Sequence, residues 1–225
     1  MSSNGRGHAE QVRIALRPIG SGLPLGFFSF AIGMLLLGCE ALGFIPVHEQ
    51  HTDGMILMAF VFPLEFVATV FAFLARDTLG ATTLGLFSTS WLTYGWLQLA
   101  SPPGARSVTV AIYLIGFSTA IVLLGILSAL GKPFFTVLLL ASATRQLLDA
   151  VYELGGSRPL YHAAGGFALT LTAVAMYGGV ALGLEDARQR EVLPLFRRGG
   201  ADAAFQGFEA QLERLEAEPG VRQQL

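Results

Sequence analysis

Four ionisable side chains interrupt long apolar stretches of this sequence: Glu40, Glu65, Arg145 and Asp149. A charge in hydrocarbon-like surroundings costs several kcal/mol unless it faces a cavity or a partner. A guanidinium is a permanent cation whose planar fork matches a carboxylate, and an acidic side chain is able to carry a proton. These residue types therefore indicate the binding of an anion or a proton, unless they only neutralise one another.

The spacing of these residues leaves structural and functional interpretations open. Arg145 and Asp149 are four residues apart on one helical face, where they would form an ion pair. In the functional interpretation Arg145 attracts an anion, and Asp149 or Glu65 sets its availability. Glu65 follows Pro63 by two residues and is either a proton carrier or the partner of a neighbouring helix. Glu40 lies near the end of an apolar stretch, where its carboxylate would reach the polar boundary.

A stretch rich in hydroxyl side chains, residues 82–98, is a further candidate. Thr83, Phe87, Ser90 and Tyr94 fall on one face of a helix. A face that mixes aromatic and hydroxyl groups would suit the lining of a pore. Hydroxyls that hydrogen-bond back to helix carbonyls are an equally simple explanation.

Motifs of enzymes and metal sites are missing from the sequence. It contains no P-loop, HExxH or G-x-S-x-G, and its histidines are scattered: His8, His48, His51 and His162. The sole cysteine, Cys39, leaves no internal disulfide and no cysteine metal site. A formal net charge of -2 gives no basic face for nucleic acid. We therefore expect no catalytic residue, no metal, no cofactor and no nucleic-acid partner.

The composition predicts an all-α integral membrane protein. The chain is 53% hydrophobic and only 13% charged, against roughly 25% charged residues in soluble domains. Its apolar stretches of about 20 residues match the hydrocarbon core of a bilayer. Breaks at prolines, glycines and charges predict a bundle of six transmembrane helices, at about residues 24–44, 54–75, 78–100, 107–130, 134–154 and 160–184.

The basic residues near the span ends predict the orientation, because Lys and Arg are retained on the cytoplasmic side. Arg106 and Arg158 lie on one side, and the other carries Arg6, Arg13, Arg17, Arg76, Lys132, Arg188, Arg190, Arg197 and Arg198. Both termini should be cytoplasmic. We expect an N-terminal tail at 1–22, a transmembrane domain at 23–195, and a tail with a short amphipathic helix at 196–225.

Three segments of the chain are similar to one known family. Pro24, Leu25 and Gly26 begin the first span and match the second half of an N-P-A-P-L-G-L motif. Residues 77–80 (DTLG) and 90–93 (SWLT) are similar to an N-T-F-G loop and the polar stretch that follows it. Residues 162–194, which include Tyr177, fit the last helix without a gap. Over nearly all of residues 20–195 the chain resembles the acetate uptake transporter family, also called the succinate/acetate permease or YaaH-type family.

The resemblance implies a six-helix protomer, often assembled as a hexamer, in which each copy holds its own narrow pore for acetate or succinate. Family members have a hydrophobic constriction of Phe, Tyr and Leu from different helices. By position, Phe30 is the phenylalanine, Phe87 replaces the tyrosine, and the leucine falls near Leu140 or Ala141. Glu65 stands where the family usually has glutamine.

We therefore expect a multi-pass protein of the cell membrane that moves small carboxylates, either coupled to protons or as a channel. Its partners would be the lipid bilayer, the carboxylate, protons and further copies of the chain. A non-transporting membrane sensor or assembly protein with the same fold is the alternative. Beside the constriction, the residues expected to contact substrate or proton are Glu65, Arg145, Asp149, Thr83, Ser90, Tyr94 and Tyr177.

Overall fold

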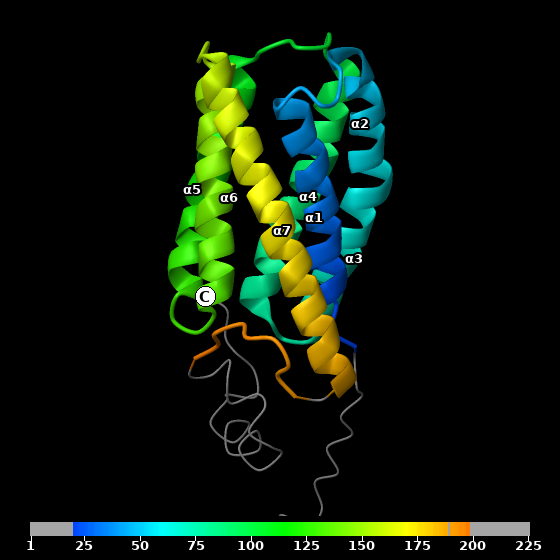
Figure 1. The fold of residues 1–225 in the computed structure, drawn as a ribbon, viewed down its shortest axis with the longest axis vertical. Helices are drawn as coiled ribbons and strands as arrows, with labels where there is room; N and C mark the ends of the chain where they lie inside the picture. Colours follow the sequence, from blue (N-terminus) through cyan, green and yellow to red (C-terminus); the bar gives the residue numbers. More distant parts are fainter. Residues whose placement is uncertain (1–19, 189, 199–225) are drawn as a thin grey trace, which may run out of the picture.

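A computed structural model describes residues 20–188 and 190–198, and within these ranges all regular structure is helical (Figure 1). The amphipathic helix expected in the C-terminal tail lies outside the described residues. The elements follow one another as α1 (Leu23–Ala41), η2 (Val47–Glu49), α2 (Gln50–Ile56), η3 (Leu57–Val61), α3 (Phe62–Leu74), α4 (Thr78–Ala100), α5 (Val108–Ser128), α6 (Pro133–Glu153) and α7 (Arg158–Arg188).

The second span is a composite helix that begins earlier than the sequence predicts. The expected span begins at Gly54, whereas helix already begins at Val47, directly after the extended residue Pro46. In its middle, η3 is a π-helical turn that ends two residues before Pro63. Proline lacks the N–H for the helical ladder, and its ring crowds the carbonyl four residues earlier. A π turn at this point is a known way to accommodate such a break within a continuous helix.

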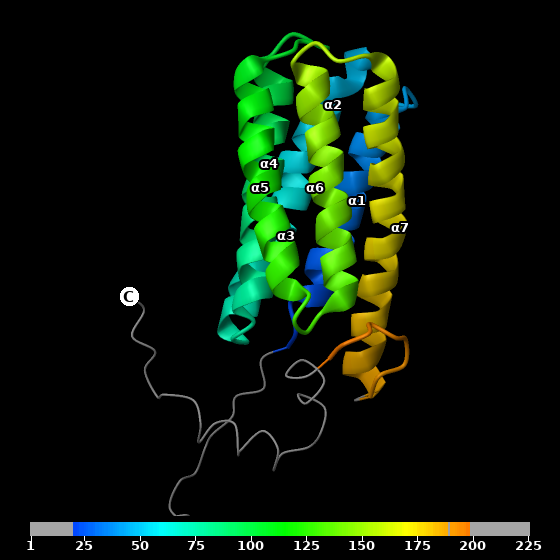
Figure 2. The ribbon, with the colours of Figure 1, turned by 90° about the vertical axis from the view of Figure 1, so that its left-hand side faces the viewer.

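The helices pack as a closed ring. Each long helix contacts the next in the order α1, α3, α4, α5, α6 and α7, and α7 in turn contacts α1. Figure 2 shows the α5–α6 hairpin in front of the other helices, with α7 along one side. Small residues permit the close packing: a Cβ added to Gly33 of α1 would lie 2.9 Å from the ring of Trp91 on α4. The ring encloses an apolar core that includes the aromatic residues Phe27, Phe30, Phe87, Trp91 and Phe117.

Five of these helices are long and apolar enough to cross a bilayer: α1, the composite Val47–Leu74, α5, α6 and α7. The remaining long helix, α4, has the bounds that the sequence predicts, but its many hydroxyl side chains lower its hydropathy. α7 runs to Arg188, beyond the predicted end near residue 184. The length and apolar character of these helices are those of a multi-pass membrane protein.

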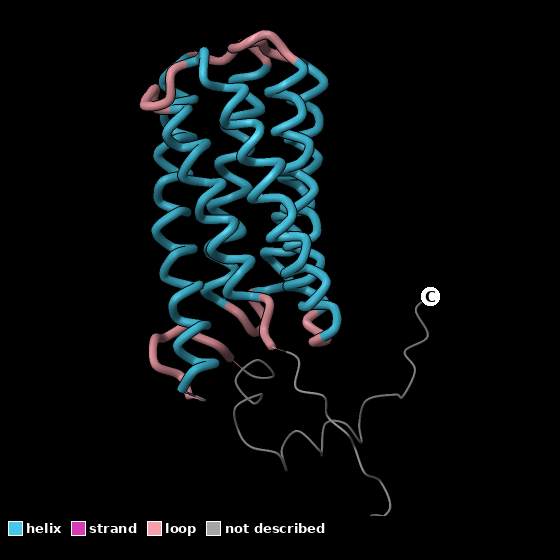
Figure 3. Tube along the Cα trace, turned by 90° about the vertical axis from the view of Figure 1, so that its right-hand side faces the viewer, coloured by secondary structure: helices cyan, strands magenta, loops and turns pink. Residues whose placement is uncertain are grey.

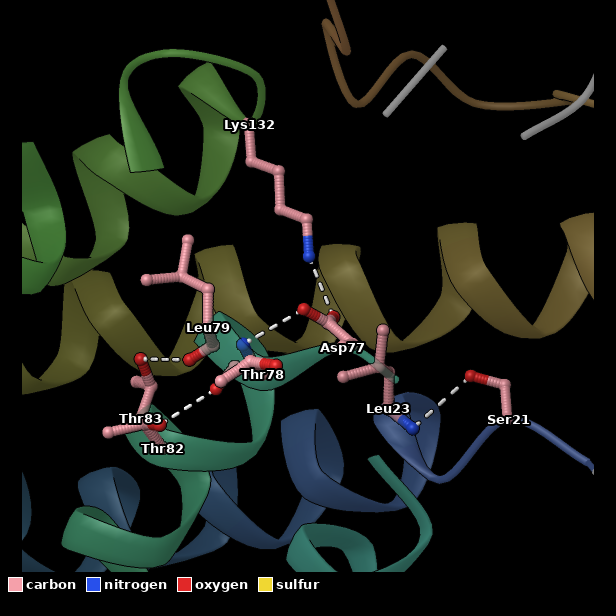
Figure 4. Close-up of polar contacts among 9 residues, drawn as sticks. Ser21, Leu23, Asp77, Thr78, Leu79, Thr82, Thr83 and Lys132 are labelled. Carbon is pink, nitrogen blue, oxygen red and sulfur yellow. Dashed lines mark hydrogen bonds and ion pairs between the residues drawn. The ribbon is translucent and has the colours of Figure 1, made fainter. Parts of the chain in front are cut away.

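The start of α1 and the end of α7 lie at the same end of the bundle, as do the turns α3–α4 and α5–α6 (Figure 1; the loops are pink in Figure 3). We call this the N-terminal end. Here Asp77 caps α4 by accepting a 3.0 Å hydrogen bond from the Gly80 amide, and it forms a 2.7 Å ion pair with Lys132 (Figure 4). One carboxylate therefore joins the two turns.

Candidate functional site

Phe30 of α1 and Phe87 of α4 meet inside the bundle. Their ring centroids are 5.0 Å apart and the rings are edge to face, at 77°. The two residues are only 4% and 2% exposed. Trp91 packs on Phe30 at 6.0 Å, and Phe117 of α5 packs on Phe87 at 5.4 Å. We call these four residues the aromatic barrier; it is the feature expected of a constriction built from several helices.

Two small cavities share Phe87 as a wall. Each has a volume of about 20 Å³, enough for a water molecule. The Glu65 cavity lies toward the N-terminal end and is lined by Gly26, Phe27, Phe30, Glu65, Thr83, Leu84, Phe87, Phe135 and Leu138. The Arg145 cavity lies on the other side and is lined by Met34, Leu37, Phe87, Ser90, Trp91, Tyr94, Tyr113, Leu114, Phe117, Arg145 and Gln146.

Glu65 is completely buried, with 0% exposure, in the middle of the composite second span. Its Oε2 accepts a hydrogen bond from Nε1 of Trp91, a member of the aromatic barrier. Its Oε1 has no hydrogen-bond partner within the described ranges. Glu65 is thus the partner of a neighbouring helix through one oxygen, as one of the two interpretations predicts, and its other oxygen lies unpartnered beside a cavity.

Arg145 and Asp149 form the ion pair that their spacing predicts. Nη2 of Arg145 lies 2.9 Å from Oδ2 of Asp149, and the side chains are 5% and 2% exposed. Arg145 nevertheless lines its cavity, and its Nε has no partner among the residues described. Gln146, whose Oε1 is also unpartnered there, lines the same cavity and was not identified from the sequence. Pairing and access to the cavity therefore coexist.

The hydroxyls of α4 bond to their own helix, as the structural interpretation predicts. Thr83 donates to the carbonyl of Leu79 at 2.9 Å, and Ser90 donates to the carbonyl of Phe87 at 2.7 Å (Figure 4 shows the Thr83 bond). Both side chains also line the cavities. Because their hydrogens are already engaged, they offer a ligand mainly their acceptor lone pairs. Tyr94 lines the Arg145 cavity without such a bond in the described structure.

The α6 residues expected at the constriction lie elsewhere. Leu140 is 41% exposed and packs beside Gly125 on α5, so it faces away from the barrier. Ala141 is half-buried against the core and is not among the residues lining either cavity. Leu138, one helical turn before Ala141, lines the Glu65 cavity instead. The structure thus places a leucine near Phe30 and Phe87, at a different position from the one expected.

Tyr177 and most of the motif at residues 24–26 lie outside the cavity walls. Tyr177 donates a hydrogen bond from its hydroxyl to the carbonyl of Pro194 at 3.0 Å, and it is not part of either cavity wall. It therefore holds the segment after α7 against the bundle. At the start of α1, Gly26 lines the Glu65 cavity, whereas Pro24 occupies the first turn and Leu25 is exposed.

A second polar cluster lies at the opposite end of the bundle. Glu40 accepts hydrogen bonds from Gln50 at 3.0 Å and from Gln98 at 2.8 Å, so neighbouring helices hold it. Gln98 also donates to Asp53 at 3.4 Å. The sequence assigned Asp53 to a loop, but it is buried in α2, on the face that continues four residues later at the fully buried Leu57. That helical spacing would have revealed it.

A ring of long apolar helices around an aromatic cluster, with buried ionisable side chains on both sides of it, defines a polytopic membrane protein with polar sites inside its bundle. The sequence profile described as the GPR1/FUN34/yaaH family matches residues 5–193. The chain therefore belongs to this family, and its assignment to the acetate uptake transporters is confirmed.

A solved structure shows the same fold. The structure of the bacterial acetate channel SatP aligns with a TM-score of 0.70 and 20% sequence identity, covering 79% of this chain and 99% of that chain. No curated protein sequence matches the chain. Family and fold are those of a transporter or channel rather than of an enzyme.

Proposed function

We propose that this protein moves acetate, or a carboxylate of similar size, across a lipid bilayer through the centre of its own helix ring. The observation that carries the proposal is the buried Phe30–Phe87 contact with a cavity on each side. Family membership and the shared fold with an acetate channel support it. A hydrophobic constriction between polar sites is an established way to restrict water while a selected solute passes.

Arg145 supplies the attraction for the anion. A carboxylate that enters a narrow apolar space loses hydration, and a nearby cation offsets part of that cost. The guanidinium is paired with Asp149 but still lines its cavity, beside Tyr94 and Gln146. The substrate therefore approaches a site that is almost neutral overall and rich in donors, which favours brief binding over trapping.

The sixth span is α4, and both termini lie in the cytoplasm. α4 packs between α3 and α5 in the ring, and its hydroxyls are bonded to helix carbonyls, which makes lipid or protein surroundings tolerable. At the N-terminal end lie the turn that contains Arg76, the turn that contains Lys132, and the segment with Arg197 and Arg198. By the positive-inside rule this end faces the cytoplasm. The membrane that holds the protein is then the plasma membrane of the cell.

Coupling to protons and assembly into a homo-oligomer complete the proposal. Glu65 and Asp149 are the buried acids beside the two cavities. The barrier is formed entirely within one chain, so each copy would hold its own path. Exposed apolar side chains on the outside, among them Leu123, Ile126 and Val137, suit lipid or a neighbouring copy.

A non-transporting membrane sensor with this fold is the second candidate. It is favoured by one observation: each cavity has room only for about one water molecule, and the barrier between them is closed. A sensor would bind a carboxylate in one cavity without releasing it on the other side.

Flux measurements separate the two functions. Radiolabelled acetate uptake into liposomes that contain the purified protein should exceed uptake into empty liposomes, and an inward-acidic pH gradient should stimulate it. The empty liposomes are essential because neutral acetic acid crosses lipid unaided. Permeability equal to that of empty liposomes, together with measurable acetate binding, would favour the sensor.

A further inference from the structure

The bond from Trp91 assigns different roles to the two carboxyl oxygens of Glu65. An indole N–H only donates, so Oε2 of Glu65 must accept. Oε1 has no partner in the described part of the chain, although the side chain is completely buried. A proton carried by Glu65 therefore belongs on Oε1, the oxygen whose hydrogen-bonding capacity is unused.

The Glu65 cavity contains nothing to offset a negative charge. The residues that line it include no Lys, Arg or His. The hydroxyl hydrogen of Thr83 is engaged by the carbonyl of Leu79. Arg145 is paired with Asp149 and lines the cavity on the far side of Phe87. Because an ionised Glu65 would be an unpaired buried charge, these surroundings favour its neutral acid.

We infer that neutral Glu65 donates a hydrogen bond from Oε1 to the carboxylate beside the aromatic barrier, and that this lone donor restricts the path to monocarboxylates. The inference rests on the proposed function and names the substrate class for the same path. Trp91 holds Glu65 in place from the other oxygen, so the donor is fixed before the substrate arrives.

A dicarboxylate would leave its second charge unsatisfied. Once Oε1 is engaged, the remaining walls are mainly apolar, including Phe27, Leu84, Phe135 and Leu138. A site rejects a ligand strongly when a buried polar or charged group is left without a partner. Acetate flux should therefore exceed succinate flux by at least about tenfold.

Two substitutions of nearly equal size test the donor in proteoliposomes loaded with radiolabelled acetate. Glu65→Gln keeps an N–H donor for the substrate and an acceptor for Trp91, so its acetate flux should stay within about threefold of wild type. Glu65→Met removes both, and its flux should fall at least about tenfold. Glu49→Gln is the matched control, because Glu49 is an exposed acid of η2.

Binding gives a readout that does not depend on flux. Trp96 is 62% exposed, and Trp96→Phe leaves Trp91 as the sole tryptophan. In this background, acetate should change the fluorescence emission of Trp91 both in the protein with Glu65 and in the Glu65→Gln variant. Succinate should change it in neither. This titration remains informative if Glu65→Met fails to fold, which size-exclusion chromatography in detergent would reveal.

Each contrary result overturns the inference in its own way. Wild-type acetate flux in Glu65→Met would show that no donor is needed, and a large gain in Glu65→Gln would show that Glu65 is a charged obstacle. Loss of flux in Glu65→Gln, or succinate flux equal to acetate flux, would also overturn it. Absence of any wild-type acetate flux above empty liposomes would instead overturn the proposed function, and with it this inference.

Discussion

The two cavities beside the aromatic barrier are similar in size but opposite in chemistry. The Arg145 cavity contains a cation, already neutralised by Asp149, together with amide and phenol groups. The Glu65 cavity has one buried acid, and its wall contains no cation. In the proposed path, two different sites therefore lie on either side of an apolar contact, and an anion would exchange charge attraction on one side for a hydrogen bond on the other.

This difference has an energetic reason. A paired charge inside a protein is tolerated because its partner offsets the loss of hydration, whereas an unpaired one is strongly unfavourable. The buried guanidinium of Arg145, a permanent cation, is tolerated because Asp149 follows one turn later on the same helix. Glu65 has only the neutral indole of Trp91. The cost of burying a charge therefore explains both arrangements: the charge of Arg145 has a partner, and Glu65 stays neutral and serves as a donor.

The largest effect should follow from breaking the ion pair of the Arg145 cavity. Arg145→Met leaves Asp149 buried and unpaired, which should lower the free energy of unfolding by about 3–5 kcal/mol, and acetate flux should fall at least about tenfold. Thermal unfolding in detergent and liposome flux measure the two effects. The double variant Arg145→Met/Asp149→Leu should regain stability but not flux; recovery of both would show that the pair serves only the fold.

Removal of the wall between the cavities should have the next largest effect. Phe87→Ala deletes a fully buried ring that contacts Phe30 and Phe117, at a cost of about 3 kcal/mol of stability. Without the ring the two cavities join, so larger carboxylates such as butyrate should pass and selectivity for acetate should drop. If selectivity in competition flux assays is unchanged, Phe87 does not separate the two sites.

A smaller effect is expected on the Glu65 side. Trp91→Phe keeps most of the ring that packs on Phe30 but removes the N–H that Glu65 accepts. Loss of this bond should cost about 1–2 kcal/mol of stability and reduce acetate flux a few-fold, because the donor is no longer held in place. Trp96→Phe, at an exposed position, is the control and should change neither quantity.

The smallest effect should come from Ser90. Its hydroxyl is bonded to the carbonyl of Phe87, so Ser90→Ala removes a local helix contact and leaves the charged groups intact. We expect a stability change below about 0.5 kcal/mol and acetate flux within about twofold of wild type. A tenfold loss would instead show that the Arg145 cavity depends on hydroxyl contacts as well as on charge.

Local sequence patterns predicted much of the site. The ion pair of Arg145 and Asp149 follows from their separation by one helical turn, and the hydroxyl bonds of α4 involve carbonyls three or four residues away. The rotation of α6 was not predictable in this way. Leu138 rather than Leu140 lines a cavity because of how α6 packs against α5 and α7, and the spacing of residues within α6 does not determine contacts between separate helices.

The sequence by itself determined the lipid environment of the chain and the positions of most of its helices. Apolar stretches of membrane length require every backbone polar group to be satisfied within a helix, and Asp77 and Ser107 start α4 and α5 through local caps. Only the tertiary structure decided which faces meet inside the ring. The bond between Trp91 and Glu65 and the contact of Phe30 with Phe87 join different helices, and their formation depends on how those helices pack together.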